Sequence, residues 1–364
     1  MNIELKNLFD LFTHEGTFLS VEPYGIGHIH DTYRIQTAEH NKDDYIIQKI
    51  NNKIFKDIPQ LQKNIERVTV HLHSKLTKIP GANVKRESLT LIPAKNGNSW
   101  IEDDSGNFWR MFIFITNHRS YNIVDSPDKA FEGGKAIGRF QAMLADMLGE
   151  PLYETIPKFH DVENRINLCI DRIQKNPCGR VSEVKEEIKE YLDRGEEMKT
   201  ILKLGRAGKI PLRITHNDTK FNNILLDEND KALCVIDLDT VMPGYVHYDF
   251  GDAIRTVANT AAEDEKDLSK IEMNITLFEA YASGYLSEVG KTLNEVEKEY
   301  LAFAPKLITY IMGIRFLTDY IDGDNYYKIH HKHHNLQRSR AQLKLVQSME
   351  RQYDEMKKIV KKLA

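Results

Sequence analysis

A polar stretch near the middle of the chain constrains the fold more than any other part. Residues 216–223 read His-Asn-Asp-Thr-Lys-Phe-Asn-Asn, so Asp218 stands two positions after His216 and five positions before Asn223. The Leu-Arg-Ile-Thr run at 212–215 leads into this stretch and predicts an entering strand. The sequence therefore predicts a strand that ends in a polar loop.

The residues after this loop predict a hairpin. Residues 224–226 are apolar, an Asp-Glu-Asn-Asp turn signal follows, and a second apolar run at 232–236 leads to Asp237. The return strand of such a hairpin brings Asp237 close to Asn223, although fourteen positions separate them. Carboxylate and amide oxygens are the ligands that hard divalent cations prefer. We therefore expect Asn223 and Asp237 to form a Mg2+ site.

The order His, Asp, Asn and a strand-borne Asp is typical of enzymes that transfer phosphoryl groups. This chemistry needs a carboxylate beside the attacking hydroxyl and oxygen ligands for magnesium. Asp218 is the candidate catalytic base, and it would contact the substrate through the attacking hydroxyl. Asp and Asn are also common turn residues. A chance turn is the alternative, but it would have to explain all four positions in the right order.

A second candidate lies downstream, where residues 248–252 contain an Asp-Phe-Gly sequence. In protein kinases an Asp-Phe-Gly motif binds magnesium. In this chain no apolar run leads into Asp249, and a Pro-Gly pair at 243–244, which predicts a turn, precedes it. We therefore expect Asp249 to cap the helix that follows, because exposed backbone N–H groups at a helix start favour an acidic side chain.

The N-terminal third predicts a small sheet. Strand-like runs at 18–35 are joined by a loop that contains Gly25 and Gly27, which would let backbone amides approach phosphates, although an ordinary hairpin turn looks the same. A later strand, 45–50, carries Lys49 in an apolar frame. We expect Lys49 to pair with nucleotide phosphates, as a strand lysine does in kinases. An exposed lysine on an edge strand is the alternative.

A helix follows this strand. Asp57 is a plausible cap and Pro59 fits the first turn. Glu66 could pair with Lys49 or remain a solvated surface residue. One face carries Leu61, Ile65, Val68, Leu72 and Leu76.

The order of elements predicts an α+β, two-lobed, protein-kinase-like fold. Residues 1–115 would form an N-terminal nucleotide-binding lobe, an antiparallel sheet with one helix. Residues 116–364 would form a larger, mainly helical lobe with the catalytic and sugar-binding sites, including an amphipathic helix at 183–202 and a long charged helix at about 336–363. A chain of 364 residues is long enough for two lobes.

Residues 313–327 combine Arg315 with carboxylates and with aromatic rings such as Tyr326, around a turn at Gly323. Planar hydrogen-bonding groups and ring faces are typical of sugar sites, and a helix end with a satisfied arginine is the alternative. The four histidines within 330–334 have no spacing typical of a metal site, and we expect a surface segment.

Composition narrows the partners. With 50 basic and 54 acidic residues the net charge is -4, which gives no strong attraction to nucleic acid or to anionic membranes. No run approaches the length of a membrane span, and the N-terminal residues lack the apolar core of a signal peptide. The three cysteines show no metal-type clustering. We expect a cytoplasmic monomer.

On these motifs the chain resembles the N-acetylhexosamine 1-kinases, within the aminoglycoside phosphotransferase and choline kinase-like superfamily. The resemblance rests on residues 25–33, 48–51, 216–223, 236–244, 248–252 and 315–324. It implies ATP and Mg2+ as cofactors and phosphorylation of the C1 hydroxyl of N-acetylglucosamine or N-acetylgalactosamine, a small sugar substrate that Arg315 and Tyr326 would hold.

Two other functions remain open. The first is a kinase for another small alcohol, such as choline, an amino alcohol or an aminoglycoside. Cationic acceptors favour a carboxylate or an aromatic cage, whereas Arg315 would repel them. The second is a nucleotide-binding module without catalysis, which the presence of a candidate base and metal ligands disfavours.

Overall fold

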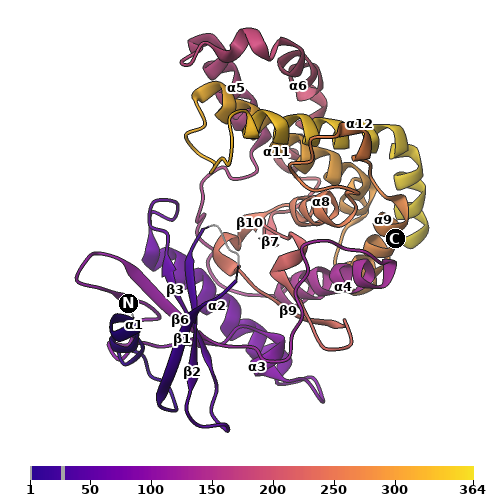
Figure 1. Ribbon diagram of the computed structural model, residues 1–364. Coiled ribbons are helices and arrows are strands. Elements are labelled where there is room, and N and C mark those ends of the chain that lie inside the picture. Colours follow the sequence, from indigo (N-terminus) through magenta and orange to yellow (C-terminus); the bar gives the residue numbers. More distant parts are fainter. Residues whose placement is uncertain (1, 26–28) are drawn as a thin grey trace.

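The computed structural model describes residues 2–25 and 29–364 and shows two lobes (Figure 1). The N-terminal lobe is built on an antiparallel sheet with strand order β1-β2-β3-β6-β4, and β5 pairs with β6. The strands are β1 (Phe18–Pro23), β2 (Asp31–Thr37), β3 (Tyr45–Ile50), β4 (Leu91–Ile92), β5 (Ile101–Glu102) and β6 (Phe108–Ile113).

The two faces of this sheet have different neighbours. Ile47 of β3 lies opposite Met111 of β6, and both are fully buried in a core that includes helix α1 (Asn2–Phe9). Because successive side chains of a strand point to opposite faces, the neighbouring residues Gln48 and Arg110 face the other way, toward the C-terminal lobe. One face of the sheet is therefore structural and the other closes a cleft.

Helix α2 (Ile58–Leu76) forms as the sequence predicts. The Asp57 side chain accepts a hydrogen bond from the Gln60 N–H, and Pro59 lies in the first turn. The predicted apolar face is buried and packs against the C-terminal lobe, so this helix shares the larger core of the molecule. The buried residues of that face are Leu61, Ile65, Val68, Leu72 and Leu76.

The C-terminal lobe is mainly helical. Its longest helix, α12, lies along α11, and α4 packs closely on α9 (Figure 1). The helices after α2 are α3 (Val84–Glu87), α4 (Pro127–Leu144), α5 (Val162–Lys175), α6 (Lys185–Met198), α7 (Thr200–Arg206), α8 (Val246–Val257), α9 (Ile275–Val289), α10 (Glu295–Glu299), α11 (Ala304–Asp322) and α12 (His334–Leu363). The predicted helix at 183–202 is thus two helices, α6 and α7, with a break at Lys199.

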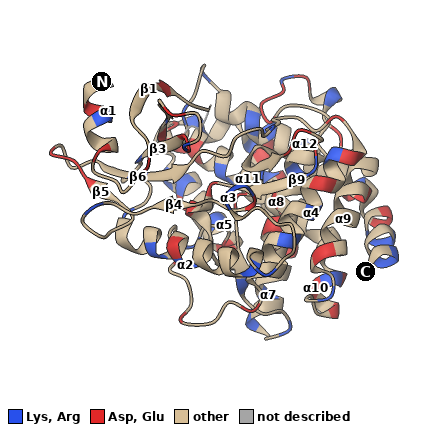
Figure 2. Cartoon of the chain, turned by 90° about the horizontal axis from the view of Figure 1, so that it is seen from below, with Lys and Arg blue, Asp and Glu red and all other residues tan. Residues whose placement is uncertain are grey.

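Glycine allows the close approach of α4 and α9. A Cβ atom on Gly134 would lie 2.1 Å from the backbone oxygen of Tyr281. The expectation that no run approaches the length of a membrane span is wrong for Glu295–Asp322, which is long and apolar enough to cross a membrane. However, 89% of its apolar window is buried inside the lobe, as expected for a core helix. Lys and Arg are interspersed with Asp and Glu over both lobes (Figure 2), in keeping with the small net charge.

Two small two-stranded sheets carry the polar loops of the C-terminal lobe. β8 (Ile224–Leu226) pairs with β9 (Ala232–Val235), which confirms the predicted hairpin. β7 (Arg213–Thr215) pairs with β10 (Met242–Gly244), so the Pro-Gly pair belongs to a strand and the predicted turn there is wrong. The sheet of the N-terminal lobe ends with β6 and α4 begins at Pro127, on either side of the predicted lobe boundary at residue 115.

Candidate active site

The backbone of the polar loop is held by a buried carboxylate. Asp249 accepts hydrogen bonds from the N–H groups of His216 (2.9 Å) and Asn217 (2.7 Å) and from the side-chain amide of Gln141 (2.6 Å). Burial raises the pKa of Asp249, and these donors oppose that rise. Helix α8 begins at Val246, so Asp249 lies inside its first turn and faces the loop. The prediction that Asp249 caps the helix is therefore wrong.

Asp218 lies at the centre of this loop. Its Oδ2 atom is 3.1 Å from the Lys220 ammonium and 3.3 Å from the Asn223 amide nitrogen, which also donates to the Asp218 backbone oxygen at 2.9 Å. Burial alone would raise the pKa of Asp218, but the neighbouring charges, Lys220 foremost, outweigh burial and lower it. An ionised carboxylate at neutral pH is the state that a general base requires.

Lys220 is a site residue that the sequence reasoning missed. Its side chain lies beside Asp218 and lines the cleft. The charge of Asp218, and to a lesser degree those of Asp237 and Asp252, raise the pKa of Lys220, so it is cationic. Its position two residues after Asp218 in the motif was the available signal. A cation at this position can neutralise charge on a phosphoryl group.

Asp237 reaches the same place from the end of β9. The Ile236 N–H donates to the Asn223 backbone oxygen at 2.9 Å, so the hairpin brings Asp237 beside Asn223 as predicted. Burial, and next the charge of Asp239, raise the pKa of Asp237 to about 6. The Asn223 amide nitrogen faces Asp218, so its Oδ1 atom faces away from that contact. A half-buried carboxylate in a negative environment beside an amide oxygen fits a divalent cation.

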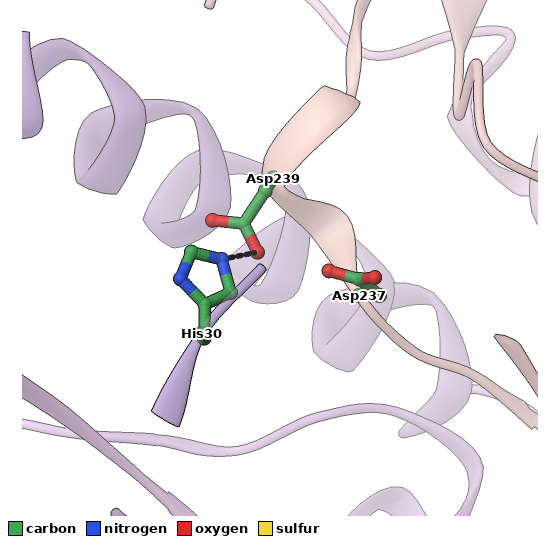
Figure 3. A group of neighbouring side chains, drawn as sticks. All are labelled: His30, Asp237 and Asp239. Atoms are coloured by element: carbon green, nitrogen blue, oxygen red, sulfur yellow. Dashed lines mark ion pairs between the residues drawn. The ribbon is translucent and has the colours of Figure 1, made fainter. Parts of the chain in front are cut away.

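Asp239 has a different function from Asp237. Both of its oxygens accept hydrogen bonds from Arg110, each at 2.6 Å, and the His30 Nε2 atom lies 3.3 Å from Oδ2. His30 Nδ1 accepts from the Asn51 N–H, so Nε2 carries the proton in the neutral ring. Figure 3 shows His30 and Asp239 directed toward each other, with Asp237 on the adjoining part of the same segment. Asp239 is thus occupied by the N-terminal lobe, which leaves Asp237 as the carboxylate for a cation.

These residues border a cavity of about 420 Å³ between the lobes. Its lining is mainly apolar, and Lys220, Asn223 and Asp237 are among its polar members. Apolar lining residues include Ile46, Leu89, Phe112, Ile115, Leu225 and Ile236. Gly25 lines the cavity with a positive φ of 76°, which glycine adopts readily, whereas Gly27 lies outside the described residues. A mainly apolar cavity with a few charged and amide groups suits a nucleotide.

The prediction for Lys49 is wrong. Lys49 pairs in register with Trp109, whose ring lies in the core on the α1 side of the sheet, so Lys49 faces away from the cavity. Gln48, one position earlier, lines the cavity instead. Glu66 lies 3.7 Å from Lys63, one helical turn earlier, and is not paired with Lys49. The sheet cation that faces the cavity is Arg110, whose Nε donates to Gln48 at 3.0 Å.

A second group of polar and aromatic residues lies near the loop of residues 216–223. The Arg315 guanidinium stacks on the rings of Phe159 (5.3 Å) and Tyr326 (5.8 Å), so the structure brings together the two residues predicted to hold a sugar. Tyr326 is 61% exposed. The buried His160 connects this group to the polar loop of residues 216–223, because its Nε2 donates to the Asn217 backbone oxygen at 2.8 Å.

Comparison with known proteins supports this interpretation of the fold. The phosphotransferase enzyme family matches residues 20–287. The solved structures that resemble the chain include a spectinomycin phosphotransferase in complex with ADP and spectinomycin (11% identity, 98% of this chain and 99% of that chain, TM-score 0.60). A second is a microcompartment-associated aminopropanol kinase (14% identity, 97% of this chain and 98% of that chain, TM-score 0.57). A third is an amicoumacin kinase in complex with AMP-PNP and Ca2+ (12% identity, 94% of this chain and 92% of that chain, TM-score 0.59). The predicted two-lobed, kinase-like α+β fold is confirmed.

Proposed function

Because the chain belongs to the phosphotransferase enzyme family, we propose that it transfers the γ-phosphoryl group of ATP to the C1 hydroxyl of an N-acetylhexosamine. The observation that carries this proposal is the position of Asp218. Its ionised carboxylate lies 3.1 Å from Lys220, which lines the interlobe cavity. The preceding residue, Asn217, accepts a hydrogen bond from His160, the chain neighbour of Phe159, on whose ring Arg315 lies. A base between a phosphate site and a hydroxyl site is what phosphoryl transfer to an alcohol requires.

ATP would occupy the interlobe cavity. The adenine ring would contact the apolar lining residues, and the phosphates would lie near Lys220. Two of the similar structures hold ADP and AMP-PNP, which supports this use of the cavity. Asn223 and Asp237 would hold Mg2+, which neutralises charge on the phosphate oxygens when it is bound.

The protein's own residues account for the transfer step. Asp218 accepts the proton of the acceptor hydroxyl as the acceptor oxygen forms its bond to phosphorus and the bond from phosphorus to the ADP oxygen breaks. Lys220, 3.1 Å from Asp218, stabilises the negative charge that the transferred group carries. Asp249 fixes the two amides that precede Asp218, so the base keeps its position. The products are a sugar 1-phosphate and ADP.

The acceptor side favours a sugar over an amino alcohol. An amino alcohol is a cation at neutral pH and needs a carboxylate or an aromatic cage. The aromatic rings on this side are already in contact with the Arg315 guanidinium. An arginine that can donate to hydroxyl or carbonyl oxygens, next to an exposed tyrosine ring, suits a neutral N-acetylhexosamine. The motif resemblance at residues 315–324 supports the same class.

The test is an acceptor panel with Mg-ATP that contains free N-acetylhexosamines, other sugars and amino alcohols, with ADP release and the position of the new phosphate as readouts. We expect a 1-phosphate on an N-acetylhexosamine. Asp218→Asn should lower kcat by roughly 10²- to 10⁴-fold, the usual contribution of a general base, while ATP binding persists. Phosphate only on an amino alcohol would reject the acceptor, and normal turnover of Asp218→Asn would reject the mechanism.

A further inference from the structure

We propose that Arg165 is a second acceptor-binding residue, and that Arg165 and Arg315 act together to bind neighbouring oxygen atoms of the acceptor and to reject protonated amines. The proposal deepens the proposed function and rests on it for the position of the acceptor. Nothing in the catalytic motif points to Arg165, which stands on helix α5, 150 positions before Arg315.

Arg165 has unused hydrogen-bond donors. Its one hydrogen bond within the described chain runs from Nη2 to the Phe159 backbone oxygen, at 2.8 Å. Its Nε atom is buried and donates to no described group. A guanidinium carries five N–H donors, so most of them are available to a ligand. A buried donor without a partner costs free energy, and an oxygen atom of a bound ligand would recover that cost.

Arg315 also has unused hydrogen-bond donors. Its only hydrogen bond among the described residues goes to the Met312 sulfur, at 3.3 Å, and sulfur is a weak acceptor. The Phe159, Tyr326 and Tyr327 rings lie against the guanidinium plane and hold it in place. No ion pair to either arginine is present in residues 2–25 and 29–364. Both guanidiniums are therefore oriented without being neutralised.

The two arginines are neighbours. Both contact Phe159, Arg165 at its backbone oxygen and Arg315 at its ring. Burial, and next the charge of Arg315, lower the pKa of Arg165 to about 10, so it remains a cation at neutral pH. Two cations at close range repel each other, and an electron-rich ligand between them would relieve that repulsion.

The pair lies near the base. Burial lowers the pKa of His160 to about 3, with smaller effects from Arg315, Arg165 and Asp218, so the charges of all three reach this ring. The neutral His160 in turn touches the loop residue before Asp218. An acceptor whose hydroxyl meets Asp218 would thus place its other oxygens toward the two arginines. The same positive charge would oppose an acceptor that carries an ammonium group.

The experiment compares N-acetylglucosamine with glucosamine, which differs by a free amine, at a pH where that amine is protonated. Wild type, Arg165→Gln, Arg165→Lys, Arg315→Gln and the double Gln variant are assayed with Mg-ATP. Arg67→Gln is the matched control, because Arg67 lies on α2 and its hydrogen bonds within the described residues go to the backbone oxygens of Glu150 and Pro151. Melting temperatures show whether each variant folds.

We expect Arg165→Gln to raise KM for N-acetylglucosamine roughly 10- to 100-fold, as for the loss of charged hydrogen bonds, with KM for ATP unchanged. The preference over glucosamine should fall. Arg165→Lys should keep that preference but not restore KM, because lysine keeps the charge and loses the planar fork. The effects of the two Gln substitutions should be less than additive, as for residues that share one ligand.

An Arg165→Gln variant that folds and keeps the wild-type KM and the wild-type preference would overturn the arginine proposal. Failure of the proposed function has a different signature, namely phosphorylation of an acceptor other than an N-acetylhexosamine. The same variants are then assayed with that acceptor. Dependence on Arg165 with a non-cationic acceptor would support the arginine pair, and activity confined to amines would overturn it.

Discussion

Arg110, which lines the interlobe cavity, and the two arginines beside Phe159 differ in how fully their hydrogen-bond donors are used. Arg110 is 2% exposed, donates to both oxygens of Asp239, and uses its Nε on Gln48. Arg165 and Arg315 make one hydrogen bond each within the described chain, and neither bond is to a carboxylate. An arginine whose donors are all hydrogen-bonded has a structural role. We infer that an oriented arginine with free donors binds a ligand.

The Arg110 and Asp239 pair joins the two lobes. Arg110 belongs to β6 of the N-terminal sheet, and Asp239 lies two residues after the candidate cation ligand Asp237. The pair therefore sets the distance between the sheet face of the cavity and the segment that carries Asp237. His30 adds a contact from the N-terminal lobe to the same carboxylate.

The largest effect on stability should come from Arg110→Gln. The change leaves the Asp239 carboxylate buried without its cation, which costs about 3–5 kcal/mol when one partner of a buried pair is removed. We expect the free energy of unfolding from chemical denaturation to fall by that amount. Burial raises the pKa of Asp239, but Arg110 and His30 outweigh burial and hold it well below its ordinary value. The stabilisation is therefore present above the ordinary carboxyl pKa and is lost as the pH falls.

Arg315→Gln is the matched control for that measurement. It removes the same charge from an arginine that no carboxylate compensates in the described part of the chain. We expect a much smaller change in the free energy of unfolding and a larger change in acceptor KM. Equal destabilisation by the two substitutions would show that Arg110 and Arg315 do not differ in this way, as a structural and a ligand-binding arginine.

An intermediate effect should follow from Asp319→Ala. Asp319 accepts hydrogen bonds from the N–H groups of Tyr326 (2.8 Å) and Tyr327 (2.9 Å) and from the Asn335 amide (2.9 Å). Its loss frees the segment whose rings orient Arg315. We expect acceptor KM to rise about 10-fold, as for one or two lost hydrogen bonds to a charged group, with KM for ATP unchanged.

Steady-state kinetics with each substrate varied in turn checks this result. Asp319→Asn is the finer variant, because an amide keeps one acceptor oxygen and should retain part of the effect. A rise of KM for ATP in either variant would mean that Asp319 supports the whole C-terminal lobe and not only the segment that carries Tyr326 and Tyr327.

The parts of the site that the sequence predicts are those with local signals. The hairpin that joins Asn223 to Asp237 is predicted by two apolar runs and the turn signal between them. Helix α2 is predicted by the capping residue Asp57 and by apolar residues spaced three or four positions apart. Arg315 and Tyr326 also lie on one short segment. They are close in space because only eleven positions separate them.

The remaining features depend on contacts between distant residues. Arg110 meets Asp239 across 129 positions, and Asp249 meets the amide of Asn217 across 32. No local pattern encodes such pairings. The error at Lys49 has another cause, because a strand points neighbouring residues to opposite faces and the frame was apolar on both sides. Only the positions of α1 and the C-terminal lobe decide which face closes the cavity.

The smallest effect should come from Lys49→Met, and it tests that assignment of faces. Lys49 lies on the α1 side of the sheet, opposite Trp109, and cannot reach the cavity without a change of register. We expect KM for ATP and kcat to change by less than about 2-fold, since surface substitutions away from a site shift free energies by roughly 0.5 kcal/mol or less. Lys220→Met is the matched lysine, because Lys220 lines the cavity beside Asp218. A large loss of activity in Lys49→Met with little loss in Lys220→Met would place the phosphate cation on the sheet and reverse the roles of the two lysines.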